Sequence, residues 1–478
     1  NSWNGIPMSI HPCLEEITRK QWGNNGIICT DGGALKLLIE AHKSFPSFAE
    51  GAAAVVKATT GQFLDAYVPY VKEALKKGLL TEADIDKAIR GNIFVALKLG
   101  LLDGDNSRNP YLSIGKDSTE TPPFMTAEAR RLAREVTAKS VVLLKNKNLL
   151  PLDAGKLRKI AVIGPYSDKI VQDWYSGTPP YETTILSGIR NAVKEDTEVI
   201  HAEDNRMGQA EKAAAAADIA IVCVGNHPYG TRADWKFSPV PSDGREAVDR
   251  KSLMLPDEDL VKLVLKANPN TILVLVSSFP YTINWSQEHV PAIVHITHCS
   301  QEQGNGLADV LFGKVNPAGR TVQTWVKDIT DLPDIMDYDI RNGRTYMYHQ
   351  GPVLYPFGYG LSYSDFTYEK IESFKQDKKN IRVTVSVKNT SGRDGEEVVQ
   401  LYASYPESKV ERPSKQLRAF RRIPIKAGET RKVTLTVPKE ELGYWNEGKQ
   451  MFVVEPGTVK LLIGASSEDI RLEGKIRL

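Results

Sequence analysis

The sequence predicts an α/β protein of several domains, with a helix-rich N-terminal part, a mostly parallel α/β sandwich and a C-terminal β-sandwich. The chain has 478 residues, which corresponds to several domains of roughly 100–200 residues each. Near-continuous apolar strands alternate with helical patterns between residues 126 and 335, as in parallel sheets covered on both faces. From residue 359 onwards the apolar period changes to two, which is typical of half-buried antiparallel strands.

The N-terminal part, residues 1–105, combines one apolar run with several helical patterns. Residues 26–31 predict a buried strand that ends at Asp31 and is followed by two glycines. Helical periodicity follows over residues 52–70 and 81–101, and the second helix begins with an N-cap threonine and an aspartate three residues later. Because one strand and several helices cannot close a sheet, we expect this part to belong to a larger fold.

A linker rich in Asn, Pro, Ser and Gly, residues 106–125, separates this part from the predicted α/β sandwich of residues 126–335. The sandwich opens with a helix over residues 126–140. Apolar strands are predicted at residues 160–164, 219–224, 271–277 and 292–296. Helices are predicted at residues 208–217, 257–267 and 306–312. This alternation indicates parallel strands joined by helical crossovers.

A second linker, residues 336–358, leads to the predicted β-sandwich of residues 359–478. Val383, Val385 and Val387 alternate with polar residues, as on a strand with one buried face. Further strands of this kind are predicted at residues 398–402, 433–437 and 458–463. Turn residues separate them at regular intervals, which favours a sandwich over an isolated hairpin.

Composition excludes several classes of function. Lys and Arg number 61 against 59 Asp and Glu, a net charge of +2, which gives no electrostatic signature of nucleic-acid or anionic-membrane binding. No run approaches the roughly 20 apolar residues of a membrane span. The cysteines are too few and too scattered for a disulfide framework or a zinc site. Cys29 and Cys223 lie in apolar runs and are expected to be buried free thiols.

Two motifs that could hold a cofactor are incomplete. Residues 160–165 resemble a nucleotide-binding strand and turn but lack the later glycines, and Pro165 has no backbone N–H for a phosphate. His295 and His298 lie close together at the end of an apolar strand. Because successive strand residues face opposite ways, this spacing is poorly suited to a shared metal ion. We therefore expect neither a cofactor nor a metal site.

Asp31 is the first candidate for chemistry. A carboxylate at the carboxyl end of a buried strand is where barrel enzymes keep catalytic groups, and the two glycines that follow allow a ligand to approach the backbone. The alternative interpretation is an Asx turn or a helix N-cap.

The second candidate is Glu246, in the polar segment that follows the strand ending at residue 224. Segments that leave the carboxyl ends of parallel strands bind ligands. The neighbouring Asp243 is the second choice for the same role, and a solvated charged loop is the alternative interpretation. In the same segment Asn226 and His227 offer amide and imidazole groups suited to a sugar, or form an ordinary turn.

Taken together, these segments resemble glycoside hydrolase family 3, the β-glucosidase and β-xylosidase group. The matching segments run through the chain in the family's order. They are residues 4–7, 22–31, 140–146, 150–152, 159–165, 249–256, 313–320, 355–363, 395–402, 412–417 and 428–429. The resemblance implies that residues 1–105 are the C-terminal remnant of a TIM-like (β/α) barrel and that residues 359–478 are a fibronectin type III-like domain.

By this resemblance Asp31 is the nucleophile and Glu246 the acid/base of a retaining, exo-acting β-glycosidase that removes terminal β-D-glucosyl residues. Such enzymes need one carboxylate to attack the anomeric carbon and one carboxylic acid to protonate the leaving oxygen. The alternatives are a β-xylosidase and a catalytically silent carbohydrate-binding or interaction module. β-Glucosides or oligosaccharides are the implied ligands, without cofactor, and a homo-oligomer is compatible with the resemblance.

Two features depart from the family pattern. The family usually has Trp after the nucleophile, whereas this chain has Gly32, so another group must form that wall of the sugar site. Most of the family's barrel precedes the nucleophile strand, so we expect the rest of it on a preceding segment or on a separate chain. The family further implies a periplasmic or secreted location, although no leader is visible.

Overall fold

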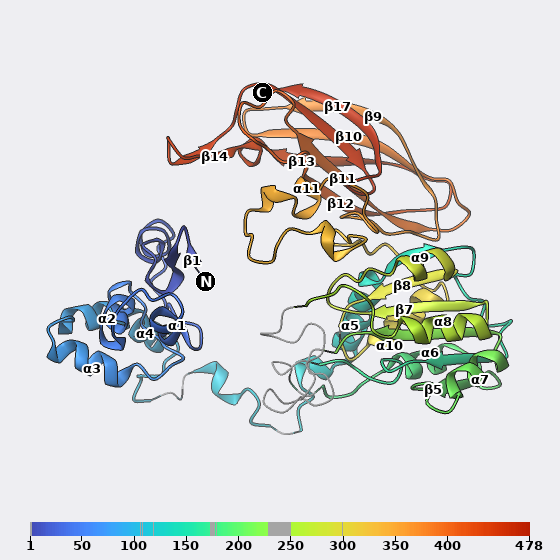
Figure 1. The fold of residues 1–478 in the computed structure, drawn as a ribbon, viewed down its shortest axis with the longest axis horizontal. Helices are drawn as coiled ribbons and strands as arrows, with labels where there is room; N and C mark the ends of the chain where they lie inside the picture. The colour runs from blue at the N-terminus through green and yellow to red at the C-terminus, as the bar shows by residue number, and fades with distance from the viewer. Residues whose placement is uncertain are drawn as a thin grey trace. The chain divides into compact units, whose positions relative to one another are not determined.

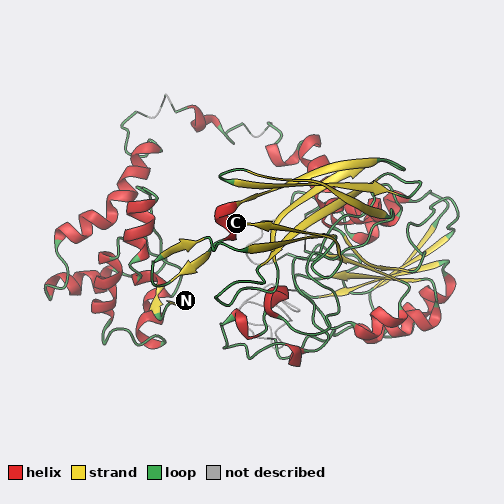
Figure 2. Cartoon of the chain, turned by 90° about the horizontal axis from the view of Figure 1, so that it is seen from above, coloured by secondary structure: helices red, strands yellow, loops and turns green. Residues whose placement is uncertain are grey.

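A computed structural model describes residues 2–105, 107, 109–117, 119–172, 177, 179–227, 250–298 and 300–478. The chain divides into two compact units, Asn1–Thr121 and Pro122–Leu478 (Figure 1). Helices account for most of the first unit, whereas the last part of the second unit consists almost entirely of strands (Figure 2). Each unit is considered by itself below.

The first unit is built from short helices and a small hairpin. Its elements are β1 (Ser2–Trp3), β2 (Ile6–Pro7), a π-helix (Leu14–Gln21), α1 (Ala34–Glu40), α2 (Phe48–Lys57), α3 (Val68–Lys76) and α4 (Glu82–Lys98). The capping signal of α4 is confirmed, because the side chains of Thr81 and Asp84 each accept a hydrogen bond from the other's backbone N–H.

The single helix predicted over residues 52–70 is wrong, because the chain forms α2 and α3 with a break between them. Thr59 has a φ of 68°, which no helix accommodates. Within the break, the N–H groups of Gly61 and Gln62 donate to the carbonyl of Ile28. This pairing with a distant segment replaces the helical hydrogen bonds.

The strand predicted at residues 26–31 is present only as a single parallel bridge between Cys29 and Gln62. The expectation that Cys29 is buried is also wrong, since its side chain is exposed. Of this run only Thr30 is buried. In the described part of the chain the segment pairs along one edge only, which leaves Cys29 uncovered.

A six-stranded sheet organises the first part of the second unit. Its strands are β3 (Val142–Asn146), β4 (Lys159–Ile163), β5 (Glu198–Ala202), β6 (Ile219–Gly225), β7 (Thr271–Val276) and β8 (Ala292–Ile296). The order is β3-β8-β7-β6-β4-β5. All neighbouring strands are parallel except β3, which pairs antiparallel with β8.

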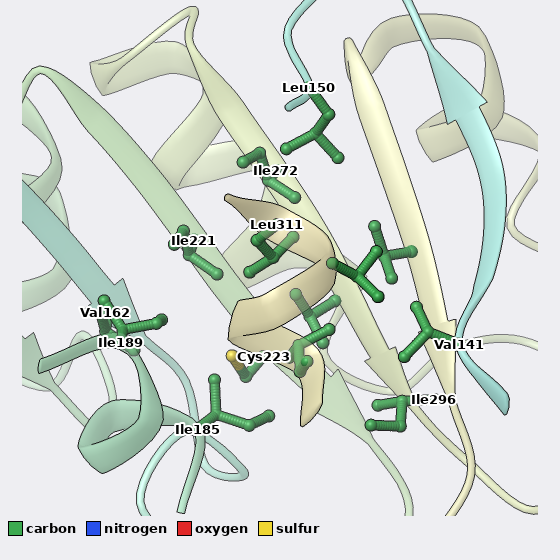
Figure 3. Close-up of a cluster of buried hydrophobic side chains, with 14 of the residues drawn as sticks. Val141, Leu150, Val162, Ile185, Ile189, Ile221, Cys223, Ile272, Ile296 and Leu311 are labelled. Carbon is green, nitrogen blue, oxygen red and sulfur yellow. The ribbon is translucent and has the colours of Figure 1, made fainter. Parts of the chain in front are cut away.

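Helices cover the sheet and bury an apolar core on each of its faces. They are α5 (Ala127–Ser140), α6 (Ile185–Ala192), α7 (Gln209–Ala216), α8 (Glu258–Ala267), α9 (Asn284–His289) and α10 (Gln303–Leu311). Leu311 of α10 lies over Ile221 and Ile272 of β6 and β7 (Figure 3). Cys223 is fully buried in the same core, as predicted, and burial raises the pKa of its thiol.

Gly164, in the run that resembles a nucleotide-binding turn, and Gly304 of α10 both serve close packing. A Cβ at Gly164 would lie 2.3 Å from the carbonyl oxygen of Cys223, and one at Gly304 would lie 1.8 Å from that of Thr184. Only glycine permits these approaches, of β4 to β6 in the first case and of α10 to the start of α6 in the second.

The C-terminal β-sandwich has two antiparallel sheets around its own apolar core. One sheet contains β9 (Phe366–Gln376), β10 (Asn380–Asn389) and β13 (Thr430–Pro438). The other contains β11 (Gly395–Ser404), β12 (Gln416–Ile425), β16 (Thr458–Gly464) and β17 (Ile470–Arg477). A separate hairpin is formed by β14 (Tyr444–Asn446) and β15 (Met451–Val453).

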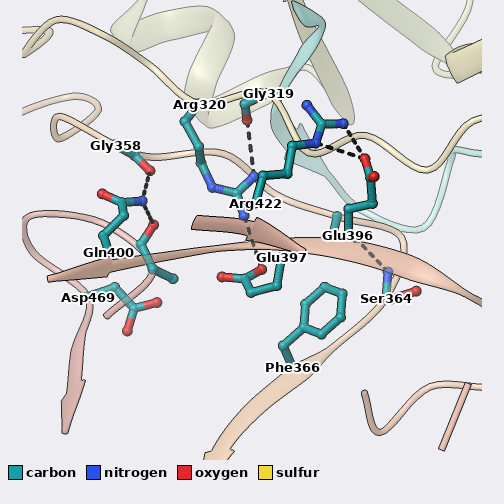
Figure 4. Close-up of polar contacts among 12 residues, drawn as sticks. Gly319, Arg320, Gly358, Ser364, Phe366, Glu396, Glu397, Gln400, Arg422 and Asp469 are labelled. Atoms are coloured by element: carbon teal, nitrogen blue, oxygen red, sulfur yellow. Dashed lines mark hydrogen bonds and ion pairs between the residues drawn. The ribbon is translucent and has the colours of Figure 1, made fainter. Parts of the chain in front are cut away.

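Polar contacts join the sandwich to the α/β part of the same unit (Figure 4). Arg320 pairs with Glu397 of β11 at 3.1 Å. Arg422 of β12 pairs with Glu396 at 2.5 Å and donates to the carbonyl of Lys139 in the last turn of α5. A cation at a helix C-terminus is favourable because the helix dipole is negative there.

Candidate active site

Residues 28–30 are held in place by pairing with residues 61–64. The N–H of Thr30 donates to the carbonyl of Gln62 at 3.0 Å, and the Thr30 hydroxyl accepts from the N–H of Leu64 at 3.3 Å. Asp31 follows directly, so it lies at the carboxyl end of a parallel pairing. This is the position at which α/β folds present ligand-binding groups.

A clamp from Arg19 fixes the start of the same segment. Its Nη1 donates to the carbonyls of Asn24 and Gly26 at 2.8 and 2.5 Å, and its Nη2 donates to the carbonyl of Thr59 at 3.2 Å. One guanidinium therefore ties together the two backbone segments that lead to the bridge between Cys29 and Gln62. It does so with the planar set of donors that is specific to arginine.

The helix N-cap interpretation of Asp31 does not hold, because Asp65 caps α1. Oδ1 of Asp65 accepts from the N–H of Gly33 at 2.6 Å, and its Oδ2 accepts from the N–H of Leu35 at 3.4 Å. Gly33, in the left-handed region with φ 76°, is the residue before the helix. No local sequence pattern indicates Asp65, which lies 32 residues after Gly33, the residue before the helix.

Because Asp65 caps α1, the Asp31 side chain has no capping role in that helix. Among the described residues its carboxylate accepts one hydrogen bond, from the adjacent N–H of Gly32 at 2.8 Å. The side chain is exposed and lines a cavity of about 210 Å³ together with Met8, Cys29 and His42. A carboxyl group in such a position is accessible to a ligand.

Gly32 leaves open space beside Asp31. A Cβ built at this residue meets nothing within 4 Å, and its φ lies outside the left-handed region. The position could therefore hold a side chain. Because glycine has none, the space beside the Asp31 carboxylate stays open.

The second pair of predicted site residues follows β6. Asn226 is buried: its N–H donates to Val276, its Oδ1 accepts from the N–H of Ser278 at 3.2 Å, and its carbonyl accepts from Nε2 of His298 at 2.8 Å. Burial, with a smaller contribution from Lys169, lowers the pKa of His227, so the neutral imidazole is favoured. Asn226 thus joins the end of β6 to those of β7 and β8, through its backbone as well as its side chain.

Glu246 and Asp243 lie outside the described residues, in the stretch 228–249. The chain is described again from Arg250, whose guanidinium stacks on Phe279 and Tyr281 at 3.8 and 4.8 Å from the ring centroids. Its Nη1 donates to the carbonyl of Pro280 at 3.1 Å. These contacts hold Arg250, the first described residue after that stretch, in place.

The two histidines at the end of β8 point to different partners. Nε2 of His295 contacts the carbonyl of Ser277 at 3.0 Å, whereas Nδ1 of His298 contacts the hydroxyl of Ser278 at 2.8 Å. Across the described ranges no group of three or more His, Cys, Asp or Glu side chains is arranged to hold a metal ion.

None of the helices in these ranges is both long and apolar enough to cross a membrane.

Comparison with known proteins decides the family. Residues 141–363 match the model of the glycosyl hydrolase family 3 C-terminal domain, and residues 397–467 match that of a fibronectin type III-like domain. A beta-xylosidase of Formosa agariphila is 30% identical over 98% of this chain. The chain belongs to glycoside hydrolase family 3. The family predicted from the sequence is confirmed.

Other members of family 3 match over the same length. A periplasmic beta-glucosidase of Salmonella typhimurium is 29% identical over 98% of this chain. Beta-glucosidase structures from Erythrobacter marinus and Listeria innocua, the latter with isofagomine, superpose with TM-scores of 0.82 and 0.83 at 26% and 25% identity, covering 99% and 100% of this chain. The chain spans 66% of the length of the Salmonella and Formosa relatives, and 66% and 67% of the two solved chains.

Proposed function

We propose that this family 3 chain takes part in a retaining, exo-acting β-glycosidase that hydrolyses terminal β-D-glucosyl residues, with Asp31 as the nucleophile. The observation that carries the proposal is the exposed carboxylate of Asp31 at the end of a parallel pairing, relieved of helix capping by Asp65. The named beta-glucosidases among the relatives support the substrate class.

The proposed reaction has two displacements at the anomeric carbon. A carboxylate oxygen of Asp31 forms a bond to that carbon while the bond to the leaving oxygen breaks, and Glu246 gives its proton to that oxygen. Glu246 then takes a proton from water, whose oxygen displaces Asp31. The scheme requires the two carboxyl groups to be about 5–5.5 Å apart and the acid to have a raised pKa.

The barrel assignment of residues 1–105 belongs to the same proposal. The parallel bridge between Cys29 and Gln62, with α1 and α2 between them, has the connectivity of a strand–helix–strand unit. We propose that the rest of the barrel is supplied by a further segment of the same or another chain, and that the enzyme works in the periplasm or outside the cell. The periplasmic relative supports that location.

A β-xylosidase is the second candidate, because the Formosa relative, at 30% identity, is named as one. Glucose and xylose differ by the exocyclic hydroxymethyl group, so the walls around the sugar decide between them. Gly32 leaves open space beside the Asp31 carboxylate. This space suits the glucosyl residue, which is larger than the xylosyl residue by its hydroxymethyl group.

Trapping of the glycosyl-enzyme tests the nucleophile. The chain, together with the segment proposed to supply the rest of the barrel, is incubated with 2-deoxy-2-fluoro-β-glucosyl and -xylosyl inactivators, and the intact mass and the labelled peptide are determined. We expect one glucosyl adduct on the peptide containing Asp31, absent in Asp31→Asn. Asp65→Asn is the matched control, because asparagine still caps α1 and labelling should persist.

The outcomes separate the candidates. Faster labelling by the xylosyl reagent would favour the β-xylosidase. An adduct that survives in Asp31→Asn would reject Asp31 as the nucleophile. No adduct, with no turnover of a chromogenic β-glucoside, would reject catalysis by this chain and favour a silent carbohydrate-binding or interaction module.

A further inference from the structure

A second cavity lies in the C-terminal part of the chain, in the same unit as the β-sandwich and away from Asp31 in the sequence. It measures about 700 Å³ and is bounded by the end of α11 (Thr345–Tyr348), the start of β12, and the β14–β15 hairpin. We call it the Arg412 groove, after the arginine in its lining. The hairpin projects from the body of the sandwich (Figure 1).

Hydrogen bonds hold the walls of the Arg412 groove in place. The N–H and the hydroxyl of Ser414 both donate to the carbonyl of Met347 at 3.0 Å, and the hydroxyl of Tyr346 accepts from the N–H of Leu417 at 3.0 Å. Nη2 of Arg412 donates to the carbonyl of Leu442, just before the hairpin, at 2.9 Å. The groove is therefore formed before any ligand arrives, which lowers the entropic cost of binding.

Aromatic rings supply the apolar part of the lining. Tyr348, Tyr444 and Phe452 border the groove, and Phe452 is 67% exposed. Arg412 itself stacks on Tyr405 at 3.7 Å from the ring centroid. Aromatic rings beside fixed polar groups suit a ligand that presents both an apolar face and hydrogen-bonding groups.

The charges in the lining disfavour an anionic ligand. Glu411, Glu440 and Glu441 contribute three carboxylates against the guanidinium groups of Arg412 and Arg418. The excess of negative charge opposes phosphate or sulfate ligands, since like charges repel. Carboxylate acceptors next to guanidinium donors suit adjacent hydroxyl groups, each of which both donates and accepts.

We propose that the Arg412 groove is an accessory binding site for a neutral β-linked oligosaccharide. The C–H face of a pyranose ring packs on the aromatic rings, while its equatorial hydroxyls bond to the carboxylates and guanidinium groups. The volume accommodates a short oligosaccharide. Saccharide recognition follows from the groove alone, whereas the choice of gluco- and xylo-oligosaccharides rests on the proposed function.

Calorimetric titration with cellotetraose and xylotetraose tests the site. The titrations use the Asp31→Asn chain, in which turnover at the proposed nucleophile is removed but the groove is unchanged. We expect Phe452→Ala to weaken the binding of at least one of the two by about tenfold. Phe420→Ala is the matched control, because Phe420 is also a phenylalanine of the sandwich and is 66% exposed but lies outside the groove.

Arg412→Lys provides a second variant, since it keeps the charge but loses the planar donor fork. We expect it also to weaken binding, with the same thermal unfolding of the sandwich as Phe420→Ala. The proposal is overturned if neither oligosaccharide binds saturably, if Phe452→Ala binds as tightly as Phe420→Ala, or if a cationic peptide binds the groove and the sugars do not. Absence of turnover by the protein with Asp31 intact, together with Phe452-dependent oligosaccharide binding, would reject the proposed catalysis and leave this site standing.

Discussion

Among the ion pairs between described residues of the second unit, that of Arg320 and Glu397 should be the most costly to break. The two side chains are only 9% and 4% exposed. Oε2 of Glu397 binds Arg320 at 3.1 Å, and Oε1 accepts from the hydroxyl of Tyr368 at 2.9 Å. Arg320→Met removes the cation, so the Glu397 carboxylate stays buried with its charge uncompensated.

The size of the effect follows from this burial. Breaking one side of a buried pair typically costs about 3–5 kcal/mol, because the remaining ion has lost its water without keeping its partner. With an unfolding entropy of about 2.1 cal/mol/K per residue, a cooperative unit spanning residues 122–478 should lose about 4–7 °C in Tm. Replacing both partners, as in Arg320→Met with Glu397→Leu, should recover most of this loss.

Scanning calorimetry of the single and double variants measures these shifts, with hydrogen exchange on peptides from β11 to locate the destabilisation. Arg341→Met is the matched control, since it removes an arginine paired with Asp339 whose side chains are 55% and 37% exposed. Such a surface pair contributes little to stability, because water and salt screen it. If Arg320→Met and Arg341→Met lower Tm equally, or if the double variant is worse than the single one, the reasoning is refuted.

Three further predictions concern pH, capping and helix initiation. Burial lowers the pKa of His295 from 6.5 to about 4. Between these two pH values the imidazole is protonated in the unfolded chain and neutral in the folded chain. This histidine should therefore lower the unfolding free energy measured by urea titration by up to about 3 kcal/mol from pH 6.5 to pH 4, and His295→Gln should reduce the pH slope by that contribution. Asp65→Ala should destabilise the first unit by about 1 kcal/mol and Asp65→Asn much less, as measured by thermal unfolding, because only alanine leaves α1 uncapped. Thr81→Ala should cost a similar amount in the same assay by breaking the reciprocal bonds with Asp84, and no loss would contradict the capping role.

Apolar patterning predicted the central strands of the parallel sheet because those strands are buried on both faces. β6, β7 and most of β4 are uninterrupted apolar runs with every apolar residue buried. The edge strand β5 was not predicted because its sequence is not a continuous apolar run. Most of its residues are only partly buried or exposed, namely Glu198, Val199, Ile200 and His201. An edge strand has one neighbour, so its sequence is less constrained.

The first unit was harder to predict, for a reason visible in the break between α2 and α3. Residues 52–70 carry a helical pattern, yet Thr59 adopts φ 68° and the backbone of Gly61 pairs with Ile28. A contact across more than thirty residues leaves no trace in local periodicity. The same holds for Asp65, whose cap on α1 released Asp31 and which no sequence signal indicated.

The sequence by itself determined the family, the order of its parts and the residue proposed as nucleophile, because ordered motifs and hydrophobic periods are local properties of the chain. Only the tertiary structure decided that Asp31 is exposed in a cavity while Asp65 caps the helix, that Cys29 is uncovered, and that Asn226 joins strand ends. The Arg412 groove likewise exists only because α11, β12 and the β14–β15 hairpin converge. Exposure, capping and cavity shape depend on which distant segments pack together, and that information is spread over the whole chain.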